Sequence, residues 1–390
     1  MGEGHHRNST WWRTACRRER ARRAPRVTRI GLDYWPAVTH APGVGRHVRE
    51  LVRALVRLPE TPELALLEVG PGGRVMQEPA LGLAGKQVLR RRARLSRRAL
   101  QLVFRATGIG AERLLGGVDL FQRAFALHPP VEKGVPQVLP IAELPPRGSA
   151  KEQQLVRALA EIRDVIVFSA HGAEQVAQRL GVARERIHRV PVGCDHWRRD
   201  APAAQSARRA PRILVLGALR AERAPLRVLA AFERLARARD DVELCFVGRA
   251  GDAAEELRAR IANRARPRVA WLDRAREEDM PGLLASAALL VHLAREELTP
   301  VTPLEACAQG LGVVASRLPA FEEALAGEAV LVEPDAEADA AALADALAAG
   351  LASGLDAAAA ARREALAARF TWEAHARATL AVWRAVLSAQ

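Results

Sequence analysis

The sequence has little of what would place it in several specialised classes. Its four cysteines are isolated, with no CxxC pair, so neither a structural zinc site nor a disulfide framework is expected. No run of about 18 uncharged apolar residues occurs, which argues against a membrane-spanning helix. The basic start lacks the apolar core of about 7 to 15 residues that a secretory signal needs. We therefore expect a cytoplasmic protein in a reducing compartment.

Charge is spread unevenly along the 390 residues. The formal net charge is +14, but residues 1–30 carry a net +7 and residues 86–105 carry a net +8 without any acid. The remainder of the chain is close to neutral. A neutral globular body offers no basic face to DNA or RNA, so nucleic acid is not expected as a partner. The length of the chain is enough for about two folded domains, and 49% hydrophobic residues suffice to build their cores.

Apolar segments alternate with amphipathic ones through both halves of the chain. This alternation predicts strands at residues 27–33, 64–69, 118–121, 137–144, 164–169, 212–216, 242–247, 269–272, 287–293, 312–316 and 329–332. It predicts helices at residues 43–58, 152–162, 226–236, 253–264, 280–287, 304–309 and 338–369. A polar stretch rich in Ala, Pro and Arg separates the two series and reads as a linker. Strands that alternate with helices indicate parallel, doubly wound sheets.

Two glutamates flank one predicted strand-to-helix turn. Glu297 and Glu305 lie eight positions apart, after the apolar strand and around Pro300 and Pro303. In an open parallel sheet, ligands bind at the carboxyl ends of the strands, where helix N-termini offer free N–H groups to an anion. Taken alone, the spacing fits two solvated carboxylates equally well, and Glu296 is a rival for the role of Glu297.

Several motifs occur in a definite order along most of the chain. They are IGLD at 30–33, GVGRHVRELVRAL at 43–55, RVPVGCD at 189–195, LGALRAERAPLRVLAAF at 216–232, ELCFVG at 243–248, the glutamate pair within PLEACAQGLGVVAS, and FTWEAHARATLAVWRAVL at 370–387. Their order and spacing resemble the family-4 retaining glycosyltransferases. The resemblance implies the GT-B fold, an α/β architecture in which two Rossmann-like, doubly wound parallel-sheet domains face each other across a cleft.

The resemblance also implies a division of the chain, because the last helix of such proteins crosses back to the first domain. The expected parts are a basic disordered tail at 1–25, an acceptor-side domain of 26–195 plus 372–390, a linker at 196–211 and a donor domain of 212–371.

In this family each matching residue has a role, which the resemblance carries over. Glu305 would accept hydrogen bonds from the ribose hydroxyls of the donor, a bidentate role that suits an ionised carboxylate. Glu297 would face the transferred sugar near its reacting carbon. Arg223 would neutralise the leaving diphosphate, which matters because such enzymes work without a metal. The other expected substrate-binding residues are Gly43, Gly45, Gly217, Leu298, Thr299, Val301 and Thr302.

The sequence departs from the family at three places. The usual Glu-Gly-Phe-Gly is Glu297, Leu298, Thr299 and Pro300 here, so two glycines that present N–H groups are missing. Ala218 or Glu222 stands where a phosphate-binding Arg is usual, and Ala142 with Glu143 replaces a His-Asp pair.

We predict a retaining hexosyltransferase with a nucleoside diphosphate sugar as donor, no metal or other cofactor, and a hydroxyl of a glycan or lipid-linked glycan as acceptor, as in polysaccharide biosynthesis. The departures leave an alternative open, a catalytically inactive GT-B protein that is a partner or scaffold for another glycosyltransferase.

The basic segment 88–105 interleaves leucine, valine and phenylalanine with arginine. This pattern is typical of a helix that lies on an anionic bilayer. It fits a solvated loop or helix face equally well. With the lipid-linked acceptors of the family in mind, we expect a peripheral contact with the inner face of the membrane.

Overall fold

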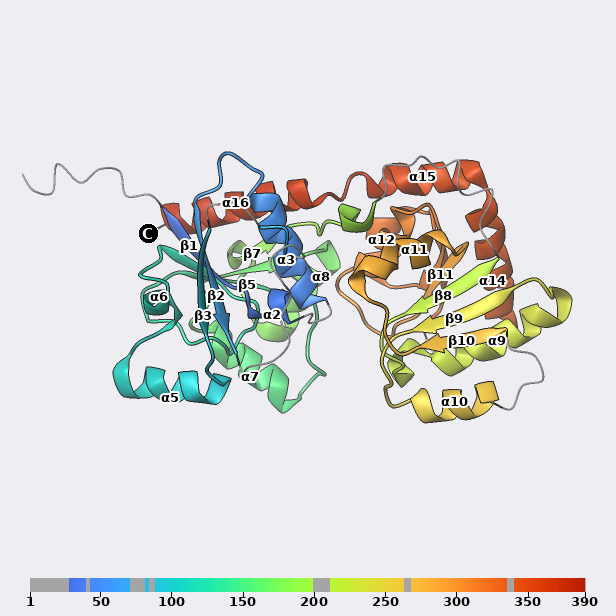
Figure 1. The fold of residues 1–390 in the computed structure, drawn as a ribbon, viewed down its shortest axis with the longest axis horizontal. Helices are drawn as coiled ribbons and strands as arrows, with labels where there is room; N and C mark the ends of the chain where they lie inside the picture. The colour runs from blue at the N-terminus through green and yellow to red at the C-terminus, as the bar shows by residue number, and fades with distance from the viewer. Residues whose placement is uncertain are drawn as a thin grey trace, which may run out of the picture.

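The chain forms two α/β domains that lie side by side along the long axis of the molecule (Figure 1). The structure, a computed structural model, describes residues 28–39, 43–70, 81–83, 88–198, 211–262, 268–334 and 340–389. The predicted tail at 1–25 and most of the predicted linker at 196–211 lie outside these residues. Each domain is built on a sheet whose strands are all parallel, which confirms the predicted fold class.

The first sheet has seven strands in the order β3-β2-β1-β4-β5-β6-β7. Its strands are β1 (Arg29–Asp33), β2 (Glu63–Val69), β3 (Leu89–Ala93), β4 (Leu120–Gln122), β5 (Gln137–Pro140), β6 (Asp164–Val167) and β7 (Ile187–Arg189). Its helices are α2 (Trp35–Val38), α3 (Val44–Leu55), α5 (Arg97–Thr107), α6 (Ala111–Leu114), α7 (Ala150–Leu159) and α8 (Ala170–Leu180). The central strand β1 is buried because it pairs with β2 on one side and β4 on the other.

The second sheet has six strands in the order β10-β9-β8-β11-β12-β13. Its strands are β8 (Arg212–Leu216), β9 (Glu243–Val247), β10 (Val269–Leu272), β11 (Leu289–His292), β12 (Gly312–Ser316) and β13 (Val330–Val332). Its helices are α9 (Pro225–Ala238), α10 (Ala254–Ala262), α11 (Met280–Ala285), α12 (Val301–Cys307), α13 (Pro319–Leu325), α14 (Ala340–Leu355) and α15 (Ala357–Ala367). Helix α14 approaches the sheet closely through Gly354, where a Cβ atom would lie 1.8 Å from the carbonyl oxygen of Ala288.

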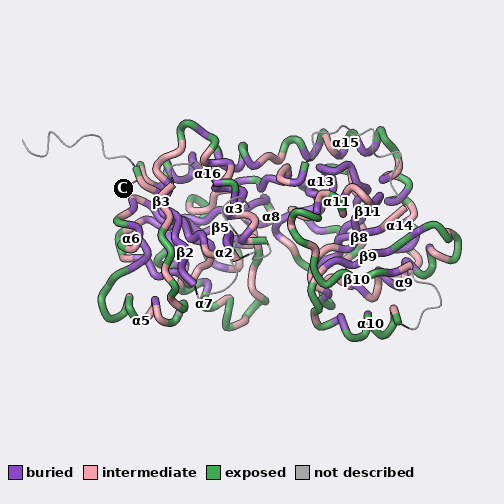
Figure 2. The backbone as a smooth tube through the Cα atoms, viewed as in Figure 1, coloured by how far each residue is buried: buried purple, intermediate pink, exposed green. Residues whose placement is uncertain are grey.

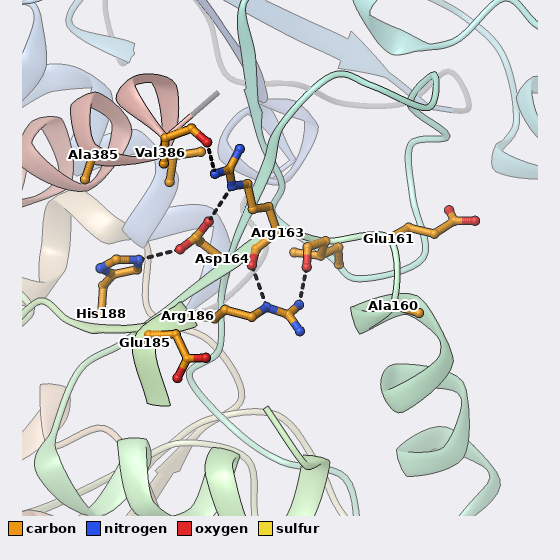
Figure 3. Close-up of a pocket in the computed structure, with 11 residues that line it drawn as sticks. Ala160, Glu161, Arg163, Asp164, Glu185, Arg186, His188, Ala385 and Val386 are labelled. Atoms are coloured by element: carbon orange, nitrogen blue, oxygen red, sulfur yellow. Dashed lines mark hydrogen bonds and ion pairs between the residues drawn. The ribbon is translucent and has the colours of Figure 1, made fainter. Parts of the chain in front are cut away.

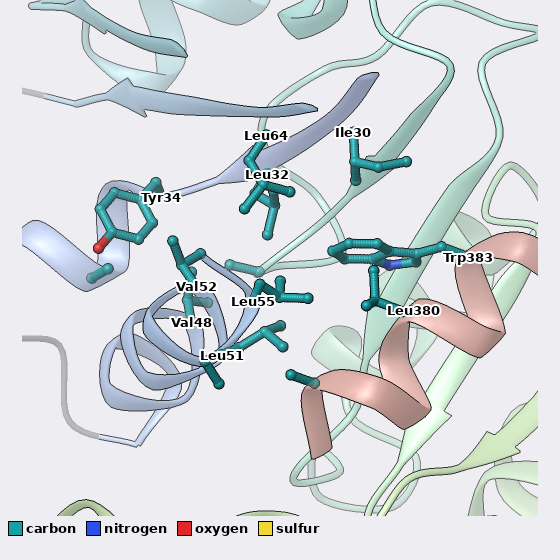
Figure 4. Close-up of a cluster of buried hydrophobic side chains, with 14 of the residues drawn as sticks. Ile30, Leu32, Tyr34, Val48, Leu51, Val52, Leu55, Leu64, Leu380 and Trp383 are labelled. Atoms are coloured by element: carbon teal, nitrogen blue, oxygen red, sulfur yellow. The ribbon is translucent and has the colours of Figure 1, made fainter. Parts of the chain in front are cut away.

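The last helix, α16 (Trp372–Ser388), leaves the second domain and packs on the first, beside α3 (Figure 1). Its apolar face joins the core that β1, β2 and α3 form, and Leu380 and Trp383 point toward Leu51 and Leu55 (Figure 4). The indole N–H of the buried Trp383 donates to Gln122 Oε1 at 2.6 Å. Burial of this face, more than helix propensity, holds α16 in place.

The basic segment 88–105 is not one helix, contrary to the expectation. Its first part is the edge strand β3, and α5 begins only at Arg97. An edge strand tolerates charged side chains because one of its sides faces solvent. Arg90 Nη2 lies 2.5 Å from Glu68 Oε1 and Arg92 Nε lies 3.1 Å from Glu68 Oε2, so the buried Glu68 of β2 pairs with these two arginines of β3.

In the described ranges, no single helix has the length and apolar character needed to cross a membrane. The helical stretches Ala340–Leu355 and Ala357–Ser388 meet the criterion only as a pair, and they are bent by 88° at the break between them. Leucines of α14 and tryptophans of α16 are buried in the two cores, so these stretches serve as core helices.

Candidate functional site

The turn from β11 to α12 lies where the two domains meet. The carbonyl oxygen of Leu298 accepts a hydrogen bond from Ser169 Oγ at 2.7 Å. Thr299 Oγ1 donates to the carbonyl oxygen of Ala142 at 2.9 Å. Because β11 sits in the interior of its sheet, the turn projects from the carboxyl end of the strands, the edge at which open parallel sheets bind ligands. Both bonds cross from the second domain to the first.

Glu305 lies on α12 at this interface and is almost fully buried. Its Oε1 atom is 2.7 Å from Arg46 Nη1 and 3.3 Å from His196 Nε2. Burial alone would raise the pKa of the carboxyl, but the charge of Arg46 and the contact with His196 outweigh it and hold the pKa below its usual value. Glu305 is therefore an ionised carboxylate between the domains.

Arg46 and His196 are themselves held in place. The Arg46 guanidinium lies 4.1 Å from the ring centroid of Trp197, a cation–π geometry. His196 Nδ1 accepts a hydrogen bond from Trp372 Nε1 at 3.0 Å. Since Nδ1 accepts, the ring proton sits on Nε2, which faces Glu305.

The predicted glycines of the first domain position Arg46. Gly43 precedes α3 with a φ of 67°, in the left-handed region that favours glycine. Gly45 is buried in the first turn of α3, directly before Arg46. This segment therefore brings a guanidinium, rather than only its backbone, to Glu305.

Glu297 belongs to a second cluster, formed entirely within the second domain. Its Oε2 atom lies 2.9 Å from His292 Nε2 and 3.3 Å from Arg223 Nη1. Arg223 Nη1 is in turn 2.9 Å from His292 Nε2. Burial opposes ionisation of Glu297, but His292 and Arg223 lower its pKa below the usual value. Gly217 lies beside Arg223 with a φ of 120°, so a glycine suits this turn for its backbone conformation.

The neighbouring Glu296 points elsewhere. Its Oε1 atom binds Arg179 Nη1 of α8 at 2.5 Å, across the interface. Glu296 and Glu297 are thus separated by their partners, and the eight-residue spacing selects the glutamate that lies beside Arg223.

Of the other predicted residues, Leu298 and Thr299 are buried, Val301 packs on the core of the first domain, and Thr302 is half-buried. Leu298, Thr299 and Val301 contact the first domain, whereas no such contact involves Thr302 among the described residues. Their roles toward a substrate stay predictions.

Sequence reasoning missed Arg46, His196 and His292. His196 is buried between Trp372 and Glu305, and His188 Nε2 lies 2.7 Å from Asp164 Oδ1. The only local signal was the position of Arg46 directly after the predicted glycines and of His196 directly after the RVPVGCD motif.

A cavity of about 620 Å³ lies away from this interface, at the amino ends of β6 and β7 (Figure 3). It is lined by Ala160, Glu161, Ile162, Arg163, Asp164, Glu185, Arg186, His188, Ala385, Val386 and Ala389. The Arg186 guanidinium donates to the carbonyl oxygens of Leu159, Ile162 and Arg163. Asp164 pairs with both Arg163 and His188, so these lining groups already have partners within the protein and the cavity receives no functional role. In the described residues, no group of three or more His, Cys, Asp or Glu side chains is placed to hold a metal ion.

Residues 210–352 match the family model described as glycosyl transferases group 1. No match was found among curated proteins. Among solved structures, HepE of Anabaena in complex with UDP and glucose is similar over 91% of this chain and 99% of its own, with 17% identity and a TM-score of 0.67.

Two further structures cover 93% of this chain, each with a TM-score of 0.64. They are a glycosyltransferase from Rickettsia africae, with 14% identity over 99% of its chain, and a sucrose-phosphate synthase from Thermosynechococcus elongatus, with 16% identity over 100% of its chain. The chain therefore has the GT-B glycosyltransferase fold, and the predicted resemblance to group 1 glycosyltransferases is confirmed. Its assignment to family 4 stays a prediction.

Proposed function

We propose that this protein is a retaining glycosyltransferase that moves a hexose from a nucleoside diphosphate sugar to a hydroxyl of a glycan or lipid-linked glycan. The observation that carries the proposal is the pair of ionised carboxylates around one strand-to-helix turn at the domain interface, each beside an arginine. The match to group 1 glycosyltransferases spans Arg223, Glu297 and Glu305. The HepE complex with UDP-glucose makes uridine diphosphate sugars the first donors to test.

Each proposed role follows from the chemistry of the side chain. Glu305 accepts hydrogen bonds from the two ribose hydroxyls, and Glu297 accepts them from the sugar near its reacting carbon. Arg223 stabilises the negative charge that develops on the departing diphosphate, so no metal is required. In the proposed retaining step, the acceptor hydroxyl attacks from the face that the diphosphate leaves, and the leaving phosphate takes up the hydroxyl proton.

Donor binding requires a rearrangement of the described conformation. Arg46 occupies Glu305 Oε1, the atom proposed for the ribose. A buried carboxylate is stable only while it is paired or hydrogen-bonded. We propose that the ribose hydroxyls take over from Arg46 as the two domains part.

One observation favours the alternative, an inactive GT-B protein that is a partner or scaffold for another glycosyltransferase. The Leu298 carbonyl and the Thr299 hydroxyl, which belong to the proposed donor-binding turn, are bonded to the first domain. In addition, the bond from Thr299 ends at Ala142, the position where the family has a His. In a site closed in this way, the polar groups have hydrogen-bond partners without any ligand.

Titration calorimetry with UDP, GDP and ADP, followed by donor hydrolysis, tests the proposal. We expect one nucleotide to bind and its hexose derivative to turn over. Glu305→Gln should weaken nucleotide affinity by on the order of tenfold, the loss of one charged hydrogen bond. Glu297→Gln should bind the nucleotide normally but lose turnover. Glu256→Gln, an exposed glutamate on α10, is the control. Failure of all three nucleotides to bind would favour the inactive partner.

The basic segment 88–105 gives a further proposed partner, an anionic membrane surface. Its arginines lie on the first domain, which would receive the acceptor. A lipid-linked acceptor, as in polysaccharide biosynthesis, would then be reached from the inner face of the membrane.

A further inference from the structure

Exposed large hydrophobic side chains gather on α5 and the turn that follows it. In the described ranges six such residues occur, and three of them lie within eight positions: Leu102 is 63% exposed, Val103 38% and Ile109 37%. The others, Leu127, Val156 and Leu272, are scattered singly. Single exposed apolar residues are ordinary, whereas a cluster on one element marks an interaction surface. Figure 2 shows α5 as a largely exposed helix at the margin of the first domain.

The outer face of α5 combines aliphatic and cationic groups. Leu100, which is 2% exposed, anchors the helix on the domain. At about 100° per residue, the side opposite Leu100 presents Leu102, and exposed Arg98 and Arg105 flank it. The hydroxyl of Ser96 caps the first turn and the left-handed Gly108 ends the helix. The element is thus a complete helix that presents this face to solvent.

The surroundings of α5 are strongly basic. No Asp or Glu occurs between Glu78 and Glu112. Arg90 and Arg92 of β3 form ion pairs with Glu68. Further exposed arginines lie at positions 91, 94, 98 and 105. An uncompensated cationic surface with protruding aliphatic side chains matches an anionic lipid bilayer, which supplies phosphates and an apolar layer beneath them. Nucleic acid lacks such an apolar layer.

We propose that α5 and its following turn dock on an anionic lipid bilayer. Leu102, Val103 and Ile109 enter the boundary between headgroups and acyl chains, while Arg98 and Arg105 contact lipid phosphates. This deepens the proposed function, because it narrows the membrane contact of segment 88–105 to one helix and excludes the strand β3 from the inserted part.

The position of α5 fits delivery of an acceptor. The buried Leu100 lies near Asp33, the last residue of β1, so the inner side of α5 packs close to the carboxyl edge of the first sheet. The docked helix would thus hold this edge near the lipid. This link to the acceptor rests on the proposed function.

Cosedimentation with vesicles tests the docking. The full chain is mixed with vesicles of phosphatidylcholine alone or of phosphatidylcholine with phosphatidylglycerol. We expect sedimentation only with the anionic vesicles, and a decrease as salt is raised. The double variant Leu102→Glu/Val103→Glu and the double variant Arg98→Glu/Arg105→Glu should each lower the partition coefficient by at least about tenfold.

Two matched controls separate docking from diffuse attraction. Arg234→Glu/Arg237→Glu makes the same charge change on the exposed side of α9, and Leu272→Glu places one charge on β10. Both should sediment like the parent chain. Absence of sedimentation of the parent chain overturns the proposal, as does an equal loss in the α9 variant. Donor hydrolysis by all variants should equal that of the parent chain, so vesicle binding without any hydrolysis would reject the transferase and keep the docking.

Discussion

The two domains meet in two different ways on the two sides of their junction. Around the β11–α12 turn the contacts are polar and charged: Arg46 binds Glu305, Arg179 binds Glu296, and Glu323 accepts from the backbone N–H of Ala170 at 2.8 Å. Around α16 the contacts are mostly apolar and aromatic, with Trp372 and Trp383 in the core of the first domain.

This difference indicates which contacts between the domains can be replaced by other partners. Polar groups in the first set can exchange one partner for another, such as a ligand hydroxyl or water, with little net change in free energy. The apolar face of α16 gains nothing from water and stays buried. We call the buried contact of α16 with the first domain the joint. We call the polar contacts of Glu305, Glu296 and Glu323 the seam, because these groups can exchange partners.

The sharpest test of the permanent joint is Trp383→Ala. Removal of a fully buried indole should lower the free energy of unfolding by about 4 kcal/mol, because it leaves a cavity and strips Gln122 of its donor. Urea denaturation followed by circular dichroism measures the change. Val156→Ala, at a 41% exposed position on α7, is the control. A loss below about 1 kcal/mol would show that α16 is dispensable for the first domain.

Arg46→Ala tests the seam. It leaves the buried Glu305 carboxylate without its cation, so the free energy of unfolding should fall by about 3 kcal/mol, the lower end for a broken buried pair because Arg46 is itself a quarter exposed. Arg184→Ala breaks an exposed pair with Glu174 and should change stability by less than about 1 kcal/mol. Equal effects in the two variants would contradict a structural role for the seam. In calorimetry, tighter nucleotide binding by Arg46→Ala would show that Arg46 competes with the ribose.

As the pH falls, the stability contributed by the joint should be lost before the stability contributed by the seam. Burial lowers the pKa of His375 to about 4 and that of His47 well below its usual value. The unfolded chain therefore takes up protons first, and stability present above pH 6.5 is lost as the pH falls toward 4. Between pH 6.5 and 5 the loss from His375 should be about 1.5 kcal/mol, and the lowered pKa of His47 adds to the loss in the same direction.

Melting temperatures from pH 7 to 5 measure this loss, and His375→Asn should flatten the profile. The Glu305 carboxyl of the seam contributes little in this window, because its pKa lies below the usual 4.5 and its share of stability is lost only at lower pH. An unchanged slope in His375→Asn would contradict the assignment.

The smallest effect concerns the start of α16. The backbone N–H of Ala374 donates to Thr371 Oγ1 at 3.1 Å. Thr371→Ala should lower the free energy of unfolding by about 1 kcal/mol, whereas Thr371→Ser keeps the cap and should lose little. Denaturation of both variants measures the difference. Identical midpoints would show that the Thr371 cap does not stabilise the joint.

Much of the fold could be predicted because each domain repeats a short-range pattern. The apolar run before Glu297 and the amphipathic stretch after Gly43 encode β11 and α3 directly. The strand β3 was missed because its arginines suggested a solvated helix, and only pairing with Glu68 of the neighbouring strand makes them compatible with a sheet.

The candidate site was predictable in part. The eight-residue spacing found Glu297 and Glu305, since both lie on one turn. The partners of Glu305, Arg46 and His196, are more than 100 positions from it, so no local pattern reveals them. Such contacts arise from closure of the two domains, which spacing does not encode.

The return of α16 has a consequence for how the molecule is made. A ribosome releases Val48, Leu51 and Leu55 early, but the helix that covers them emerges only after the whole second domain. The half that is synthesised first is thus completed last, with its apolar groove exposed in the meantime. Nascent chains that stall before position 372 are the species on which we expect chaperones to act.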